Sequence, residues 1–172
     1  MIRSGTGVPA ELFFEDLTPG REFDLGEAVV DGTEMVEFAR RYDPQWYHLD
    51  PQAAADSPYG GVIASGFFTA ALFMRAYVDG LLARAAAAAS PGLEELRWLA
   101  PVYAGDRLAT RMRVLDRAAS SRPGLGTVTL EATMTRTGVG DAHPAGGARG
   151  APADRADVLR VRFRGWFALR PS

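Results

Sequence analysis

The chain has 172 residues, 47% of them hydrophobic, and a formal net charge of -2; this fits one globular domain with a sizeable core rather than a disordered chain. It contains no cysteine and no lysine, all 19 basic residues being arginine, so disulfides, thiol catalysis, thiolate metal sites and Schiff-base chemistry are excluded. The near-neutral charge without a basic cluster speaks against binding to nucleic acid or to an anionic membrane, and two histidines are too few for a histidine-rich metal centre.

The first third of the chain predicts a strand and a helix. Residues 1–10 lack the long apolar core of a signal peptide, so we expect a cytoplasmic protein, and residues 1–12 are expected to form a loose terminus. Partial alternation over residues 21–30 predicts a strand with an irregularity near Gly26. A helix capped by Thr33 should follow. It must end before Pro44, because the residue that precedes a proline avoids helical geometry.

A long loop and a long apolar helix occupy the middle of the sequence. Residues 43–65 form a loop with at most a short helix at 51–55, and long ordered loops in compact domains are more often functional than not. Residues 66–84 have helical length and are apolar nearly all round, which predicts a helix buried on most sides, as when a sheet wraps it. Residues 85–89 could extend it. Arg75 and Asp79 interrupt its most apolar part, residues 67–82, which is also too short to be a good membrane span.

The C-terminal half of the sequence predicts antiparallel strands. After a helix stop at residues 90–92 we expect a short strand at 93–99, then alternating strands at 107–115, 127–137 and 158–169. The intervening residues 138–156 are rich in Gly, Ala, Pro and Asp and predict a flexible surface insertion. The whole chain, residues 1–172, is therefore expected to form a single domain of the α+β class, with an antiparallel sheet wrapped around a long central helix.

The chemistry is concentrated in the central loop, which reads Asp43-Pro44-Gln45-Trp46-Tyr47-His48. Asp43 and His48 lie five positions apart on a chain bent by proline, so both side chains can reach one water molecule and act as an acid/base pair. The following helix begins near Ser65-Gly66, where free amides carry partial positive charge. Gly66 lets a ligand approach its N–H, and Ser65 can cap the helix or contribute a hydroxyl.

These residues resemble the MaoC-like dehydratase family, which has a hotdog fold. The family's Asp-x-Asn-Pro-x-His motif corresponds to residues 43–48, and its Ile-Ala-His-Gly to Ile63-Ala64-Ser65-Gly66. Further similarity is found in Pro101-Val102-Tyr103-Ala104-Gly105-Asp106, which resembles the family's Pro-Val-x-x-Gly-Asp, and in residues 14–20 and 121–123. In this chain Gln45 replaces the motif's Asn, Trp46 replaces its Pro, and Ser65 replaces the common His.

The resemblance implies (R)-specific hydration of a trans-2-enoyl thioester, or the reverse dehydration, on an acyl group carried by coenzyme A or an acyl carrier. It implies that Asp43 and His48 are catalytic and that Gly66, Ser65, Gln45 and Trp46 surround the oxyanion and the substrate. It also implies a reaction without a metal or redox cofactor. We expect a homodimer, because a single sheet of this kind leaves an edge that can pair with a second copy.

Other interpretations of the same residues stay open. The chain could be a hotdog thioesterase, or a non-catalytic acyl-thioester binding module in which Trp46 narrows or blocks the pocket. His48 could be a hydrogen-bonded loop histidine, and Gly66 could serve only close packing. We expect His143 to be incidental and Arg122 to have no role in binding coenzyme A. Four aromatic residues of the apolar helix are expected to serve core or dimer packing: Phe67, Phe68, Phe73 and Tyr77.

Overall fold

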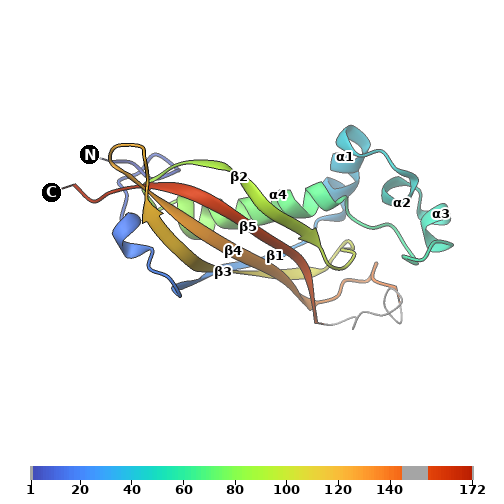
Figure 1. Cartoon of the computed structure of the whole chain (residues 1–172). Coiled ribbons are helices and arrows are strands. Elements are labelled where there is room, and N and C mark those ends of the chain that lie inside the picture. The colour runs from blue at the N-terminus through green and yellow to red at the C-terminus, as the bar shows by residue number, and fades with distance from the viewer. Residues whose placement is uncertain (1, 145–154, 172) are drawn as a thin grey trace.

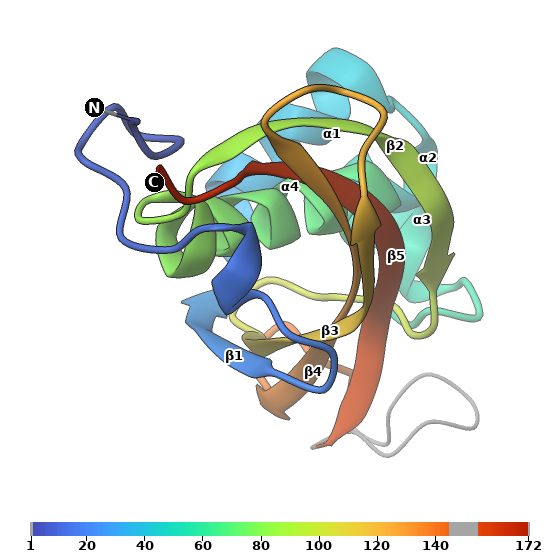
Figure 2. The same cartoon turned by 60° about the vertical axis from the view of Figure 1, so that its left-hand side comes forward.

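The computed structural model describes residues 2–144 and 155–171 and shows a five-stranded antiparallel sheet curled around a helix (Figures 1 and 2). The strands are β1 (Glu22–Val29), β2 (Ala87–Trp98), β3 (Arg107–Ala119), β4 (Leu125–Gly138) and β5 (Ala156–Ala168), in the spatial order β1-β3-β4-β5-β2. The helices are α1 (Gly32–Tyr42), α2 (Trp46–Leu49), α3 (Pro51–Ala55) and α4 (Gly66–Tyr77), with single turns at Phe14–Asp16 and Val78–Leu82. The expected α+β fold, a sheet around a central helix, is confirmed.

The core lies between α4 and the concave face of the sheet. Along β4, and over residues 108–114 of β3 and 159–167 of β5, every second residue is buried, as the alternation in the sequence predicts, because successive side chains of a strand point to opposite faces. Neighbouring strands align these inward positions, so that Met112 pairs with Ala132 and Ala132 with Val161. The large inward residues are Leu108, Met112, Val114, Leu130, Met134, Leu159, Val161, Phe163 and Phe167.

The predicted irregularity in the first strand is present at Gly26. The pairing of β1 with β3 shifts between Asp24 and Glu27, and Gly26 between them has a φ of 87°, which glycine adopts without strain. The next helix, α1, is capped by Asp31 and not by Thr33, because the Asp31 carboxylate accepts hydrogen bonds from the backbone N–H groups of Thr33 and Glu34.

Helix α4 is shorter and more exposed than expected. It ends at Tyr77 and continues as one π-helical turn, Val78–Leu82, rather than as α-helix to residue 84. Only one side of it is buried in the sheet, whereas Phe67 and Met74 on the other side are 63% and 48% exposed. The expectation of burial on most sides is therefore wrong for the described residues.

Strand β2 occupies part of the segment that was expected to extend the helix. It begins at Ala87, and Ser90 and Pro91 interrupt its pairing with β5, whereas Gly92 pairs with Arg164; residues 90–92 therefore do not end a helix. Pro91 is tolerated there because β2 is an edge strand and needs no second partner. The strand is therefore 12 residues long rather than short.

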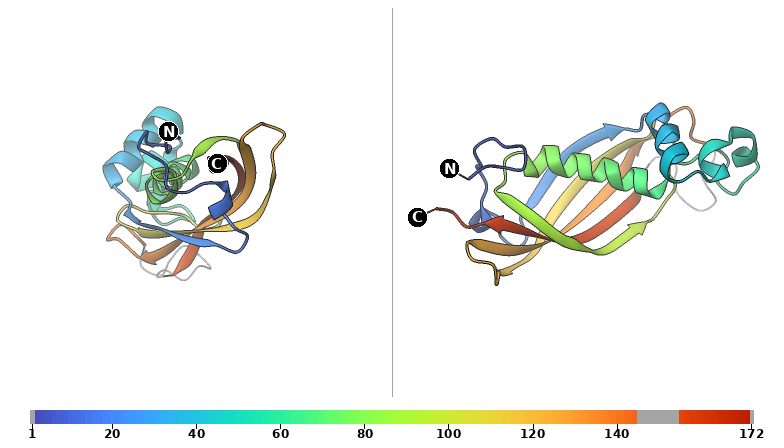
Figure 3. Two further views of the ribbon diagram at one scale, coloured as in Figure 1. Left: turned by 90° about the vertical axis from the view of Figure 1, so that its left-hand side faces the viewer. Right: turned by 90° about the horizontal axis from the view of Figure 1, so that it is seen from above.

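The two ends of the chain lie at the opposite end of the molecule from α2 and α3 (Figure 3). The N-terminal segment is not loose where it is described: Gly5 N–H donates to the Leu82 carbonyl at 2.9 Å, and Leu12 forms a bridge to Ala85. Residues 145–154 of the expected insertion lie outside the described residues. No helix in the described part of the chain combines the length and apolar character that a membrane crossing needs.

Candidate active site

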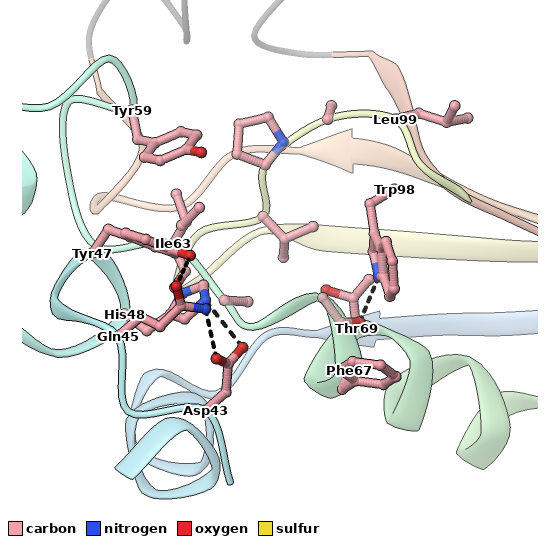
Figure 4. A pocket seen from close by; sticks show the side chains of 15 residues that line it. Asp43, Gln45, Tyr47, His48, Tyr59, Ile63, Phe67, Thr69, Trp98 and Leu99 are labelled. Carbon is pink, nitrogen blue, oxygen red and sulfur yellow. Dashed lines mark hydrogen bonds and ion pairs between the residues drawn. The ribbon is translucent and has the colours of Figure 1, made fainter. Parts of the chain in front are cut away.

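Three short stretches of backbone bring the candidate residues together at one end of the sheet (Figure 4). Helix α1 ends at Tyr42, and Asp43 leaves helical geometry with φ of -147° because Pro44 follows it. Helix α2 carries His48, and Ser65 caps α4. The short helix expected at residues 51–55 is present as α3, with Asp50 as its cap, but the segment expected to be otherwise loop also contains α2.

The Asp43 carboxylate and the His48 imidazole face each other. His48 Nε2 lies 3.3 Å from Asp43 Oδ2, and the two side chains are 5% and 24% exposed. His48 Nδ1 lies 2.7 Å from the carbonyl oxygen of Ile63. Because a carbonyl oxygen only accepts, Nδ1 carries the hydrogen, and Nε2 of a neutral ring presents a lone pair toward Asp43. When His48 is neutral, its Nε2 and Asp43 Oδ2 are two neighbouring hydrogen-bond acceptors. When His48 is protonated, the two side chains form an ion pair.

Both oxygens of Asp43 accept hydrogen bonds from the protein. Gln45 Nε2 donates to Oδ1 and Ser65 Oγ to Oδ2, each at 2.7 Å. The bond from Gln45 lowers the pKa of Asp43 most, followed by the bond from Ser65; desolvation opposes them, and His48 adds a smaller lowering. The Gln45 amide is itself oriented by Tyr47, whose hydroxyl donates to Gln45 Oε1. Asp43 is consequently held ionised and in one orientation.

The N-terminus of α4 forms the opposite wall of the site. Ser65 is buried, and its hydroxyl accepts a bond from the Phe67 N–H while donating to Asp43. Gly66 occupies the first helical position, where an amide has no intrahelical acceptor. A Cβ at Gly66 would lie 2.6 Å from the Trp98 ring, whose Nε1–H donates to the Gly66 carbonyl at 2.7 Å. Trp98 thus packs directly on the first turn of the helix.

A cavity of about 490 Å³ opens beside the pair. Asp43, His48, Gln45 and Gly66 line it. The sequence analysis did not assign the other lining residues to the site: Tyr47, Tyr59, Ile63, Ala64, Thr69, Trp98, Leu99, Ala100, Pro101 and Val102. A second cavity of about 570 Å³ shares Asp43, Gln45 and Phe67 with the first. Phe67, expected to serve packing, therefore lies between the two cavities.

Trp46 lies apart from these residues. Its side chain is 52% exposed, packs edge-on against Tyr47 and lines neither cavity, so it does not block the space beside His48. The indole that does border the site belongs to Trp98. Its role could not be read from the sequence, because it depends on contact with Gly66, 32 positions away.

Two residues that were expected to be incidental lie outside the cavities. His143 packs against Tyr103 with the ring centroids 4.6 Å apart, and Arg122 lies 4.1 Å over the ring of Trp166. Within the described residues, no three His, Asp or Glu side chains converge in a way that could hold a metal ion.

Comparison with known proteins gives the family. The model of the MaoC-like domain matches residues 15–136. The 3-hydroxyacyl-thioester dehydratase Z of Mycobacterium tuberculosis is 38% identical over 99 residues, which are 55% of this chain and 60% of that protein. The nodulation protein N of Rhizobium leguminosarum is 32% identical over 120 residues, 67% of this chain and 74% of its own length.

Solved structures agree with this result. The MaoC-like dehydratase from Rhodospirillum rubrum superposes with a TM-score of 0.75 at 33% identity, covering 94% of this chain and all of that one. The (R)-hydratase from A. caviae involved in PHA biosynthesis has a TM-score of 0.62 at 21% identity over 88% of this chain and 97% of its own, a likeness of fold. The chain whose site has been described here belongs to the family of MaoC-like domains.

Proposed function

We propose that the chain adds water reversibly to a trans-2-enoyl thioester and forms an (R)-3-hydroxyacyl thioester. The observation that supports this most is the 3.3 Å approach of His48 Nε2 to Asp43 Oδ2, beside the first turn of α4 and on the wall of a cavity. Relatives named as 3-hydroxyacyl-thioester dehydratases support the reaction class. The acyl group would arrive on coenzyme A or an acyl carrier, and the proposed steps need no metal or redox cofactor.

In the proposed hydration, a water molecule donates one hydrogen to His48 Nε2 and the other to Asp43 Oδ2. Asp43 is a weak base because its hydrogen bonds lower its pKa, so His48 takes the proton and Asp43 stabilises the resulting imidazolium. The hydroxide oxygen bonds to C3, and the C2=C3 electron pair moves toward the thioester oxygen. The imidazolium then returns its proton to C2, which completes the addition of H and OH.

The negative charge that develops on the thioester oxygen needs a donor. The Gly66 N–H is free at the helix N-terminus and lies at the cavity wall, where it can donate to that oxygen. Ser65, Gln45 and Tyr47 would act indirectly, by holding Asp43 in place.

To test this, crotonyl-CoA is added to the purified chain, and the enoyl absorbance and the concentration of free thiol are measured together. We expect loss of the enoyl absorbance without release of thiol. Asp43→Asn and His48→Ala should each lower the rate by about 10²–10⁴-fold, the usual contribution of an acid–base group. The control Asp79→Asn alters an exposed carboxylate near the other end of α4 and should retain the rate.

The same assay separates the alternatives. Release of free thiol would identify a thioesterase, since the acyl–sulfur bond would then be the one that breaks. A rise in melting temperature with crotonyl-CoA but no turnover would identify a binding module. Turnover that survives both substitutions would contradict the assignment of Asp43 and His48.

We also propose that the chain works as a homodimer. The support is an exposed apolar surface at the edge of the sheet, where β2 pairs on one side only. Four large residues of α4 and β2 lie on this surface: Phe67, Met74, Leu93 and Trp98.

A further inference from the structure

Tyr103 does not line the cavity of the candidate site, yet its hydroxyl is hydrogen-bonded to Tyr59, in the same segment as the Ile63 carbonyl that contacts His48. We propose that Tyr103 is a positioning residue: its phenol fixes residues 59–63, and the Ile63 carbonyl in that segment determines which nitrogen of His48 faces Asp43. The expected effect on the hydration rate rests on the proposed function, whereas the expected effect on the tautomer of His48 does not.

The backbone around Tyr103 is anchored in the core. Tyr103 is completely buried, and its N–H donates to Asp106 Oδ2 at 3.0 Å. The same carboxylate oxygen accepts from Arg136 Nε at 2.9 Å, and this ion pair is itself buried. Arg136, an inward residue of β4, also donates to the Pro101 carbonyl. Residues 101–106 are therefore fixed to the sheet and provide a rigid support.

The phenol of Tyr103 extends this support to the catalytic loop. Its hydroxyl donates to the Tyr59 carbonyl at 2.7 Å. Burial raises the pKa of Tyr103 to about 12, so the hydroxyl keeps its hydrogen and remains a donor at ordinary pH. A second bond runs from the Ala64 N–H to the Val102 carbonyl at 2.8 Å. The segment between Tyr59 and Ala64 is thus attached to the same support at both of its ends.

Residues 59–63 need such attachment because they include two consecutive glycines. Gly60 has a φ of 69°, and neither glycine has a side chain that could pack the segment in place. Ile63 at the end of the segment accepts the hydrogen bond from His48 Nδ1 at 2.7 Å. When the segment shifts, this acceptor moves away from the imidazole.

Loss of the Ile63 acceptor has a defined chemical result. A neutral histidine whose Nδ1–H has no partner can move its hydrogen to Nε2, where the Asp43 carboxylate 3.3 Å away accepts it. The lone pair that takes a proton from water is then absent. Tyr103 therefore favours the Nδ1–H tautomer of His48 without touching it, through one of the two hydrogen bonds that attach residues 59–64 to the support.

The experiment removes one oxygen atom. Tyr103→Phe keeps the ring and its contact with His143 but deletes the bond to Tyr59. The matched control is Tyr77→Phe, which removes the same atom from another buried tyrosine. Tyr77 ends α4, about 16 Å along the helix axis from Gly66 at the candidate site. Both variants are compared with wild type at a temperature where circular dichroism shows all three to be folded.

Nitrogen NMR of the ¹⁵N-labelled imidazoles reports the tautomer. The chain has only two histidines, so a His48→Gln sample assigns their signals. We expect the Nδ1–H form of His48 in wild type and in Tyr77→Phe, and a substantial Nε2–H population in Tyr103→Phe. The hydration kcat of Tyr103→Phe should fall roughly ten- to a hundredfold, as for a catalytic group displaced by about 1 Å. KM should change by less than about twofold, because the cavity wall is unaltered.

Two results would overturn the proposal. The first is a His48 spectrum of Tyr103→Phe that matches wild type. The second is a kcat equal to that of Tyr77→Phe despite an altered tautomer. Because the NMR measurement needs no turnover, it tests Tyr103 even if crotonyl-CoA is not hydrated. Failure of the proposed function and failure of this inference are therefore distinguishable.

Discussion

At the scale of single residues, the departures from the family motif preserve the hydrogen bonds of Asp43. Gln45, which replaces the motif's Asn, still provides an amide, and that amide donates to Oδ1. Ser65, which replaces a common His, provides a hydroxyl that donates to Oδ2. Trp46 lines neither cavity, so its replacement of Pro does not obstruct them. The carboxylate is therefore held at both oxygens despite three changed positions.

This arrangement predicts how the pKa of Asp43 responds to substitution. The bond from Gln45 is the largest cause of the lowered pKa, and the bond from Ser65 is the second. Gln45→Met removes the amide donor at similar length and should raise the pKa of Asp43. Ser65→Ala should raise it by less. Carbon-detected NMR titration of the Asp43 carboxyl would measure both shifts against wild type.

The sign of the effect on stability follows from the same shift. A carboxyl whose pKa is lowered by folding stabilises the fold above its unfolded pKa, and this contribution is lost as the pH falls through the folded value. Gln45→Met should therefore destabilise the chain more at neutral pH than in acid where Asp43 is protonated. A titration in which Asp43 keeps its wild-type pKa in both variants would contradict this account of the two bonds.

At the scale of secondary-structure elements, the start of α4 depends on close packing between Gly66 and β2. A Cβ at Gly66 would meet the Trp98 ring at 2.6 Å, far inside van der Waals contact. The absence of a side chain is therefore required at this position, and it also leaves the Gly66 N–H open to the cavity.

Gly66→Ala is predicted to damage the site through this contact. The added methyl should displace Trp98 or the first turn of α4, at a stability cost of about 1–3 kcal/mol as in other overpacked sites. If the Gly66 N–H moves away from the thioester oxygen, the hydration rate should fall about 10²–10³-fold. Thermal unfolding and crotonyl-CoA kinetics measure the two effects separately.

The control for this change is Gly61→Ala. A Cβ at Gly61 would have its nearest neighbour at 3.8 Å, an ordinary contact, and its φ lies outside the left-handed region. This variant should retain the stability and the rate of wild type. Equal rates in the two alanine variants would show that the close contact at Gly66 has no part in catalysis.

Elements defined by local patterns could be predicted from the sequence, and elements defined by distant contacts could not. The alternation in β3 to β5 is visible in the chain because its period is two residues. Residues 85–89 are all alanine and favour a helix when considered alone, but Ala87 and Ala89 pair with Phe167 and Trp166 of β5. Tertiary pairing therefore overrides their helix propensity.

The same reasoning applies to the candidate site. The loop spacing of Asp43 and His48 and the helix start at Gly66 were visible as motifs, and the structure brings all three to one cavity. The Ile63 carbonyl that orients His48, and the indole of Trp98, could not be anticipated, because each reaches the site through contacts between segments 15 and 32 positions apart.

At the scale of the whole molecule, one strip of the inner sheet face is left uncovered. Leu93 pairs with Phe163, and Trp98 with Leu159, so both β2 residues point to the side on which β5 is buried. Only the first turn of α4 packs on Trp98, and Leu93 remains 57% exposed. The adjacent face of α4 exposes Phe67 and Met74. An unpaired edge strand beside an apolar face is a common site of association.

We therefore expect the chain to be a dimer at micromolar concentration, with this strip at the interface. Leu93→Arg would place a charge in the strip and should convert the dimer to a monomer, because burying an unpaired charge is unfavourable. Val8→Arg adds the same charge at an exposed apolar residue of the N-terminal segment and should leave the dimer intact. Sedimentation velocity distinguishes the two states.

The dimer should also matter for activity, since Phe67 and Trp98 belong both to the exposed face and to the cavity wall. In a monomer, water can reach the cavity across these side chains and weaken the electrostatic interactions inside it. Leu93→Arg should therefore lower kcat/KM for crotonyl-CoA although Leu93 itself lines neither cavity. A wild-type chain that sediments as a monomer with full activity would contradict the assignment of this face to a dimer interface. A monomeric Leu93→Arg variant with full activity would show that catalysis does not need the dimer.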